Sequence, residues 1–413
     1  MPPGVVSFKL TYKYPRFTGK ESNSEAGKFT PKVQSSIIDL GLIAPNGSQV
    51  GASGSDKLSF EISETFATPG YNKTRLVPGE WNIILGAYKV ASQGIMVAYE
   101  LTFEYGEVRL LKGDLHTHTV ASDGVLTLEE LGKHARAHGL DFLAITDHNQ
   151  VISSDALPDI PGLTMIPGVE WTHYKGHANF TGVDKPFGGS FIANTPKEVT
   201  AKFQEAHQNG ALITINHPFD ENVPFTFDLE TLPFDCYEVW NGPMRMSNIQ
   251  AIGTWSGMLA SGKKTPIVCG SDYHRSQLFL YPGGPTTCVY APSAGRSDIL
   301  SALKLGHSYL VYAPDGPTLE FKAGDAIMGD SVSFAETKEM QVSVKGLQTG
   351  DVLQVVTGQD STQLAQAESN GDFEGNFVMP ASGFARVEVH REFIPGVPRL
   401  PALISNPIYF DGD

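Results

Sequence analysis

The chain has 413 residues, of which 41% are hydrophobic and 18% charged, and its 30 Lys and Arg against 45 Asp and Glu give a formal net charge of −15. Its length predicts two or three domains, since one domain usually takes roughly 100–200 residues. A negative surface repels phosphate backbones and anionic lipids, so we expect neither nucleic acid nor a membrane as a partner.

The sequence gives no signal for export or membrane insertion. No run approaches the ~18 consecutive apolar residues of a membrane span. The first residues, MPPGVVSFKLTYKYPRFTG, lack the apolar centre of a signal peptide. We therefore expect a cytoplasmic protein. The three cysteines, Cys236, Cys269 and Cys288, are far apart and odd in number, so we interpret them as buried apolar residues.

Both ends of the chain carry short runs of alternating apolar and polar residues, separated by Gly, Pro, Ser and Asn. In residues 1–108 these runs are Val6–Tyr12, Lys57–Ile62, Trp81–Ala87 and Ile95–Tyr105. In residues 317–413 they are Thr318–Lys322, Met340–Val344, Val352–Val356, Phe384–His390 and Ile404–Phe410. This pattern is typical of antiparallel strands, and it predicts a small β-sandwich module at each end.

The middle of the chain, residues 109–316, alternates strand-like with helix-like segments. Strands are predicted at Val108–His118, Phe142–Asp147, Met165–Glu170, Leu212–Asn216, Tyr237–Asn241 and Ile267–Asp272. Helices are predicted at Leu128–His138, Thr195–Gln208 and Ile249–Ala260; Thr127 with Glu130 is typical of a capping box, and Thr195 precedes Pro196 at the second helix start. Repeated strand–helix–strand units imply parallel strands in a barrel or an open sheet.

Histidines and carboxylates gather at or just past the ends of these central strands, where α/β proteins place active sites. The histidines are His116, His118, His148, His177, His217 and His274, and the carboxylates are Asp114, Asp123, Asp147, Glu170 and Asp272. Residues two apart on a strand face one side, so His116 with His118, and Asp272 with His274, would aim at one cavity. Burying so many polar groups without cations would be costly, so a shared metal site is predicted.

Five segments occur in order: GDLHTHTVASDG, LAITDHN, IPGVEWTHYKGHANFTG, INHPF and GSDYH. Together they resemble the successive metal motifs of the PHP (polymerase and histidinol phosphatase) superfamily, over roughly residues 110–313. The resemblance implies an α/β fold, a distorted (β/α)7 PHP barrel over 109–316, flanked by β-sandwich modules over 1–108 and 317–413. The segments GHAN, PGEW and SNPIYF are most similar to those of the CehA/McbA group, which includes carbaryl hydrolases.

The resemblance also implies a ligand set for two or three divalent ions (Zn, Mn or Fe). The first ion would bind His116, His118, Glu170 and Asp272, the second Glu170, His177 and His217, and the third Asp123, His148 and His274. Asp123 stands where many PHP phosphatases have histidine, and this carboxylate shifts preference toward Mn or Mg. Asp147 is expected to orient a ligand ring from behind.

The expected reaction is hydrolysis of a small-molecule ester by a metal-bridged hydroxide, with Glu170, Asp272 and His274 as the catalytic residues. No Gly-x-Ser-x-Gly motif offers a serine nucleophile. A phosphoester would be contacted by Arg275, Arg245, Lys175 and Asn241. A carbamate or carboxylic ester, the alternative, would need apolar residues at the mouth: Trp171, Phe219, Trp240, Phe279 or Tyr281. A non-enzymatic metal- or glycan-binding protein is the third interpretation, and a homo-oligomer is left open.

Overall fold

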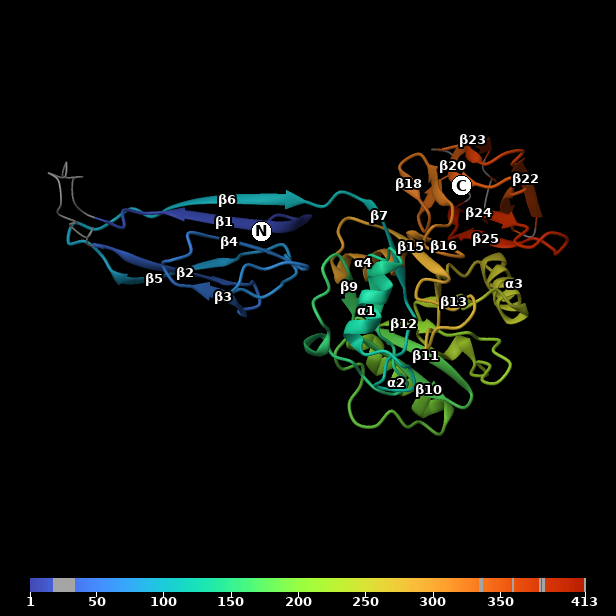
Figure 1. Cartoon of the computed structure of the whole chain (residues 1–413), viewed down its shortest axis with the longest axis horizontal. Coiled ribbons are helices and arrows are strands. Elements are labelled where there is room, and N and C mark those ends of the chain that lie inside the picture. The colour runs from blue at the N-terminus through green and yellow to red at the C-terminus, as the bar shows by residue number, and fades with distance from the viewer. Residues whose placement is uncertain (18–33, 334–336, 359, 379, 381–382, 412–413) are drawn as a thin grey trace. The chain divides into compact units, whose positions relative to one another are not determined.

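The structure is a computed structural model that describes residues 1–17, 34–333, 337–358, 360–378, 380 and 383–411 (Figure 1). Its contacts divide the chain into two compact units, Met1–Val108 and Arg109–Asp413. Every helix in the described ranges is too short or too polar to cross a membrane.

The first unit consists of two three-stranded antiparallel sheets. One sheet has the order β4 (Ser59–Ser63), β1 (Val5–Lys13), β6 (Ala98–Tyr105), and the other β3 (Gln49–Ser53), β2 (Ile37–Ile43), β5 (Asn82–Lys89). Alternation along β1 and β2 directs one face of each into a shared core that includes Phe8, Leu10, Ile38 and Leu40. The four predicted strands are confirmed. Strands β2 and β3 were not predicted, because Gly41 in β2 and Gly51 and Ser53 in β3 resemble turn sequence.

The second unit holds the central strands and all four α-helices of the described residues. One sheet has the order β10 (Gly168–His173), β11 (Gly176–Thr181), β12 (Leu212–Ile215), β13 (Cys236–Asn241), β14 (Ile267–Gly270). Its first two pairings are antiparallel and its last two parallel. The helices are α1 (Leu128–Ala137), α2 (Pro196–Gln208), α3 (Met246–Ala260) and α4 (Arg296–Leu305). Capping boxes begin α1 at Thr127 and α2 at Thr195, which confirms both predicted starts.

A second, larger sheet also lies in this unit. Strands β7 (Arg109–Asp114), β8 (Phe142–Ala144) and β9 (Thr164–Ile166) pair in parallel, and β15 (Thr286–Ala291) and β16 (Ser308–Val311) extend the sheet antiparallel from β7. It continues through strands from the last hundred residues: β25 (Leu400–Ser405), β24 (Gly383–Arg391), β26 (Ile408–Asp411), β19 (Ser331–Ser333), β21 (Val352–Thr357) and β22 (Asp360–Gln366). Residues on both sides of position 316 therefore share one sheet.

Four more strands form a small antiparallel sheet, in the order β18 (Ala326–Ile327), β17 (Thr318–Ala323), β20 (Glu339–Leu347), β23 (Gly371–Val378). Two short 3-10 helices, η1 (Ser154–Ala156) and η2 (Leu229–Thr231), complete the described elements. The predicted strand Ile404–Phe410 is in fact two strands, β25 and β26, separated by Asn406 and Pro407. Proline lacks the N–H that a continuous ladder needs.

The expected closed (β/α)7 barrel is not confirmed. Strand pairing within the described ranges leaves the five-stranded sheet and the larger sheet separate. Two isolated parallel bridges link them. Thr117 and Tyr273, which pair in one bridge, lie beyond the ends of β7 and β14; in the other, His148, beyond the end of β8, pairs with Glu170 on β10. The unit is thus a mixed α/β structure whose two central sheets meet where their strands end.

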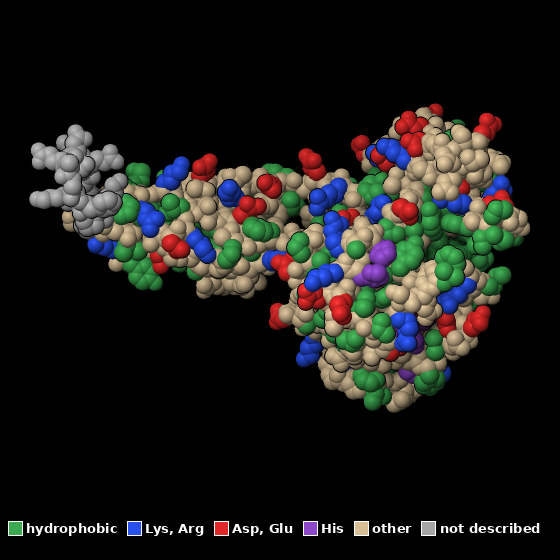
Figure 2. Space-filling view, in the orientation of Figure 1, with side chains coloured by type: hydrophobic (Ala, Val, Ile, Leu, Met, Phe, Trp, Pro, Cys, Tyr) green, Lys and Arg blue, Asp and Glu red, His purple; other side chains and the backbone are tan. Residues whose placement is uncertain are grey.

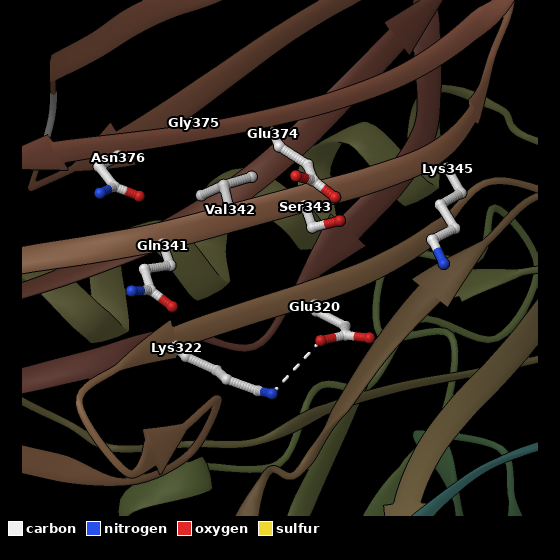
Figure 3. A pocket seen from close by; sticks show the side chains of 9 residues that line it. All are labelled: Glu320, Lys322, Gln341, Val342, Ser343, Lys345, Glu374, Gly375 and Asn376. Carbon is white, nitrogen blue, oxygen red and sulfur yellow. Dashed lines mark hydrogen bonds and ion pairs between the residues drawn. The ribbon is translucent and has the colours of Figure 1, made fainter.

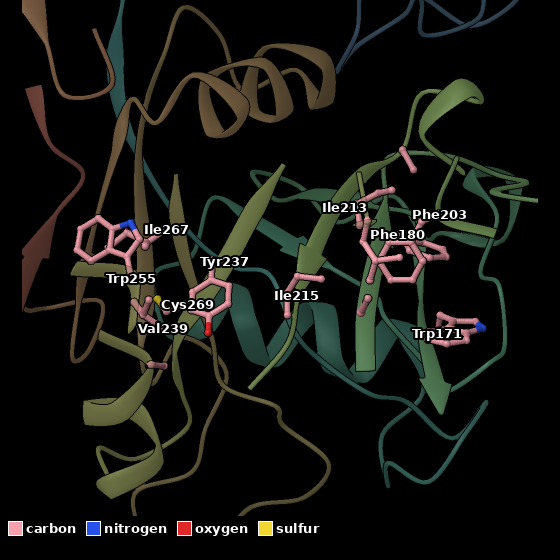
Figure 4. Close-up of a cluster of buried hydrophobic side chains, with 14 of the residues drawn as sticks. Trp171, Phe180, Phe203, Ile213, Ile215, Tyr237, Val239, Trp255, Ile267 and Cys269 are labelled. Carbon is pink, nitrogen blue, oxygen red and sulfur yellow. The ribbon is translucent and has the colours of Figure 1, made fainter. Parts of the chain in front are cut away.

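Aromatic and aliphatic side chains fill the layer between the five-stranded sheet and helices α2 and α3 (Figure 4). Trp171 is 1% exposed and Trp240 is 2% exposed, so both belong to this core. The interpretation that either could line the mouth of a substrate site is therefore wrong. The three cysteines are buried and free, as predicted.

Candidate metal centre

The histidine pairs lie beyond the strands that precede them. Strand β7 ends at Asp114 and β14 at Gly270, so the interpretation that His116, His118, Asp272 and His274 are strand residues is wrong. Their side chains nevertheless converge, because the two segments are joined by the Thr117–Tyr273 bridge and by the His118 N–H, which donates to the Tyr273 carbonyl at 3.0 Å.

Glu170, on β10, lies at the middle of the cluster and is completely buried. Ring nitrogens of five histidines surround its two oxygens. Those of His116, His177 and His217 lie 3.3, 3.2 and 3.3 Å from Oε1, and those of His148 and His118 lie 2.7 and 3.6 Å from Oε2. One carboxylate thus faces side chains from five separate positions in the chain.

Two aspartates connect the remaining members. Asp272 Oδ1 lies 3.0 Å from His118 Nε2 and 3.4 Å from His116 Nε2. Asp123 Oδ1 lies 3.2 Å from His274 Nε2 and 3.7 Å from His148 Nε2. All nine residues proposed as ligands from the sequence therefore lie in one cluster.

The cluster contains four overlapping groups whose candidate ligand atoms lie within 4.8 Å of one another: His116/His118/Asp272, His116/Glu170/His217, His148/Glu170/His177 and His118/Asp123/His148/His274. The family resemblance implied that His177 and His217 bind one ion. These two rings fall in different groups, although both lie near Glu170 Oε1. The last group corresponds to the expected third ion with His118 added.

The cluster is closed at one side and open at the other. The side chains of His116, His118 and Glu170 are 0% exposed, whereas those of His148, His274 and Asp123 are 26%, 23% and 56% exposed. A purely structural metal site is closed on all sides. The Asp123 edge of the cluster is therefore accessible to solvent.

The donor set suits divalent cations. Nε2 of His116 and both ring nitrogens of His118 are buried and make no hydrogen bond with any described residue. A buried polar atom without a partner raises the free energy of the folded state by about 1–3 kcal/mol. Imidazole nitrogens and carboxylate oxygens are the ligands that zinc and manganese use. The clusters therefore indicate divalent metal binding.

The pKa shifts within the cluster also favour cation binding. Burial lowers the pKa of His116, but the charges of Asp272, Glu170 and Glu238 outweigh burial and hold that pKa well above its ordinary value. Burial raises the pKa of Glu170 and of Asp272, yet the neighbouring histidines, His116 first, hold both pKa values well below normal. Without metal, the centre would hold protons on histidine and negative charge on the carboxylates.

Asp147 supports the site in a way that the sequence did not suggest. Its Oδ1 accepts hydrogen bonds from the Thr119 N–H at 2.8 Å and the Ser122 hydroxyl at 2.6 Å, and its Oδ2 accepts one from the Thr119 hydroxyl at 2.8 Å. These contacts hold the loop that carries Asp123. Asp147 thus orients a loop rather than a histidine ring.

The candidate substrate residues differ in how closely they approach the cluster. Asn241 is buried, and its Nδ2 donates to Asp272 Oδ2 at 3.3 Å, while its Oδ1 accepts from Arg245 Nη2 at 2.8 Å. Arg275 is exposed and donates from Nη2 to the Asp123 carbonyl at 3.3 Å. Lys175 is exposed, with its Nζ 5.9 Å from the ring centre of Tyr174. Arg275 therefore reaches the cluster through the backbone of Asp123, and Arg245 reaches it through the buried side chain of Asn241.

Two further residues support the candidate ligands, and one of them, Glu238, was missed in the sequence. Asn216, directly after β12, donates from Nδ2 to Glu170 Oε1 at 2.8 Å. Glu238 is 2% exposed on β13 and lies against His116. A charged residue inside the apolar run CYEVW was the available signal, because a buried carboxylate needs a partner.

A polar hollow lies elsewhere, on the sheet formed by β17, β20 and β23 (Figure 3). Its lining includes Glu320, Lys322, Gln341 and Glu374, and Lys322 Nζ lies 3.3 Å from Glu320 Oε2. None of the predicted site residues lines it. This hollow is therefore separate from the candidate metal ligands.

Comparison with known proteins shows what this region is similar to. Residues 114–215 match the PHP domain family. A 5'-3' exoribonuclease of Haemophilus influenzae is 43% identical over 70 residues, which are 16% of this chain and 25% of that protein. The 5'-3' exoribonuclease Rnm of Salmonella typhimurium is 32% identical over 116 residues, covering 24% of this chain and 40% of that protein. This chain thus matches well under half of either relative.

Among solved structures, a two-domain protein from Bacteroides vulgatus that contains a predicted PHP-like metal-dependent phosphoesterase resembles this chain with a TM-score of 0.40 and 17% identity, over 72% of this chain and 95% of that one. The matched residues 114–215 include six of the nine clustered residues, with Glu170 among them. Residues 114–215 of this chain are therefore similar to the PHP domain family.

Proposed function

We propose that this protein is a metal-dependent phosphoesterase that hydrolyses a small phosphorylated substrate. The observation that carries the proposal is the position of Glu170, whose carboxylate faces the ring nitrogens of five histidines at 2.7–3.6 Å. Divalent cations bound there would activate water and hold the negative charge that develops on the substrate.

The candidate ligands would bind cations on two sides of the centre. His116, His118, Glu170, His177, His217 and Asp272 would hold the cations at the closed side, and Asp123, His148 and His274 would hold a further cation at the open side. Arg245, fixed by Asn241 and 3.8 Å from Asp220 Oδ2, would contact a phosphate oxygen. A fixed guanidinium suits a phosphate group, because its N–H groups match the oxygens in geometry and charge.

The comparisons support a phosphoester over an acyl substrate. The Haemophilus and Salmonella relatives are named exoribonucleases, enzymes whose substrate bond is a phosphoester. A long RNA is disfavoured for this chain by its net charge of −15. On the face shown in Figure 2, Lys and Arg side chains are scattered among Asp and Glu rather than gathered.

One assay set tests the proposal. The purified protein, stripped with chelator and reloaded with Mn²⁺ or Zn²⁺, is assayed with p-nitrophenyl phosphate, bis(p-nitrophenyl) phosphate, a 5'-phosphorylated RNA oligonucleotide, 1-naphthyl acetate and carbaryl. We expect turnover of the small phosphoesters, and none in the stripped protein or in Asp272→Asn. Faster turnover of the acetate and carbaryl would overturn the proposal in favour of a carbamate or carboxylic-ester hydrolase of the CehA/McbA kind. Preference for the oligonucleotide would favour an exoribonuclease.

A further inference from the structure

Glu238 is a buried carboxylate that faces the cluster without belonging to any of its ligand groups. It is 2% exposed on β13. The pairing of β13 with β14 shifts register between Glu238 and Trp240. Such an irregularity re-aims side chains along a strand, so that residues three apart can face the same side. Glu238 and Asn241 consequently both point at the centre.

Both oxygens of Glu238 are occupied by donors. Oε1 lies 3.1 Å from Nδ1 of His116. Oε2 accepts the His217 backbone N–H at 2.8 Å and Asn241 Nδ2 at 3.2 Å. Asn241 Nδ2 also donates to Asp272 Oδ2 at 3.3 Å. This one carboxylate therefore contacts two of the candidate metal ligands and reaches a third through Asn241.

The contact with His116 determines which ring nitrogen is free. A carboxylate accepts hydrogen bonds and cannot donate them when ionised, so His116 must carry its proton on Nδ1. The opposite nitrogen, Nε2, lies 3.3 Å from Glu170 Oε1 and 3.4 Å from Asp272 Oδ1, and makes no hydrogen bond with a described residue. When the ring is neutral, the lone pair of Nε2 is thus directed into the centre, as ligation requires.

We infer that Glu238 is a positioning residue that selects the metal-binding tautomer of His116 and fixes the backbone of His217. This inference rests on the proposed metal centre. It adds that the affinity of the ion beside His116 depends on a carboxylate that never touches the ion. His116 is the only ion-pair partner of Glu238 among the described residues, so the carboxylate has no competing structural pairing.

The variant Glu238→Gln tests this role. Glutamine has the same shape but one acceptor oxygen, whereas the native carboxylate receives donors on both oxygens. The His217 N–H cannot change, so the amide oxygen should face it and the NH₂ group should face His116. That forces the His116 proton onto Nε2, where it would block the metal. We expect one ion to bind ~10–100-fold more weakly, measured by calorimetry and elemental analysis.

Glu205→Gln is the matched control, because Glu205 Oε1 also accepts a backbone N–H, that of Gly188 at 2.7 Å, away from the cluster. It should bind metal as the wild type does. If Glu238→Gln binds metal equally well, the inference is overturned while the proposed function stands. If the wild-type protein binds no divalent metal at all, the proposed function itself fails.

A measurement on the unmodified protein covers the case in which Glu238→Gln does not fold. In zinc-loaded protein with ¹⁵N-labelled histidine, nuclear magnetic resonance shows which ring nitrogen carries the proton, and His116→Gln identifies the signal. We expect a protonated Nδ1 and a zinc-bound Nε2 at His116. A protonated Nε2 would overturn the inference.

Discussion

The ring of His118 stacks on the ring of His274, with centroids 4.0 Å apart and planes inclined by 21°. The two residues are far apart in sequence and lie in segments that follow β7 and β14. Backbone hydrogen bonds join these segments: the His118 N–H donates to Tyr273 O, and the Val125 N–H donates to His274 O at 2.9 Å. The backbone pairing of two loops therefore sets the distance between two candidate metal ligands.

Removal of the His118 ring should release metal from the closed side of the centre. His118→Ala deletes a completely buried ring beside Asp272 and Glu170. We expect at least one bound metal ion to be lost and phosphoesterase activity to fall below about one hundredth of wild type, since direct ligands matter more than their supports. Elemental analysis and the p-nitrophenyl phosphate assay measure both quantities. His134→Ala, on helix α1, is the control and should keep its metal; full activity in His118→Ala would contradict the assignment.

Loss of Asp123 should reduce metal binding and activity less than loss of His118. Its side chain is 56% exposed, and its Oδ1 lies 3.2 Å from the His274 ring and 3.7 Å from the His148 ring. Asp123→Ala should lose the ion at the open side, retain the ions around Glu170, and keep a measurable part of the activity, within about 10–100-fold of wild type. Metal stoichiometry before and after dialysis distinguishes this result from complete loss. A variant with no metal and no activity would show that the open side is as important as the closed one.

Metal binding should release protons at neutral pH. Burial lowers the pKa of His116, but the surrounding carboxylates raise it well above the ordinary value, and Glu170 likewise raises the pKa of His148 and His217 against burial. In the metal-free state these rings hold their protons more tightly than an isolated histidine does, and a metal must displace those protons. Affinity should therefore rise with pH, about tenfold per pH unit for each proton displaced.

Calorimetry in two buffers of different ionisation enthalpy measures that proton count directly. In the variant Glu170→Gln the carboxylate charge that raises these pKa values is reduced, so fewer protons should be released. An affinity that does not change between about pH 6 and 8, with no proton release, would contradict the predicted charge state.

Gly270 should tolerate no side chain. A Cβ at this position would lie 2.3 Å from His116 Cβ and 2.8 Å from the His116 backbone nitrogen. Gly270→Ala should therefore displace His116, weaken metal binding, and lower the free energy of unfolding by about 1–3 kcal/mol. Chemical denaturation and metal titration measure the two effects.

Gly253→Ala is the matched control for Gly270→Ala. Gly253 is exposed on helix α3, and a Cβ added there would meet no neighbouring atom of the described residues within 4 Å. Alanine has a higher helix propensity than glycine. The free energy of unfolding of this variant should therefore rise by about 0.5–1 kcal/mol, and its metal binding should be unchanged. Equal stability in both variants would show that the strand next to His116 can move away.

Much of the candidate site could be predicted from the sequence, because each candidate ligand lies in a short motif that can be recognised without its distant neighbours. The motifs around His116, His148, Glu170, His217 and Asp272 each follow an apolar run, and strands that run the same way bring their ends together. Helix starts were equally local: Thr127 and Thr195 cap α1 and α2 through neighbours three residues away. Short-range hydrogen bonding and the order of apolar and polar residues are sufficient to predict these features.

Tertiary structure decided the rest. Whether Trp171 lines the mouth or the core depends on which sheet face it occupies, and it is buried. That Asp147 holds a loop, and that Glu238 turns toward His116, depends on register shifts and on contacts between residues distant in sequence. The amino-acid order determined which side chains could ligate a cation, because their chemistry is fixed by residue type. Only the tertiary structure determined which of these side chains lie together in one ligand group and which neighbours hold them in place. Pairing between strands distant in sequence sets the distances between the side chains.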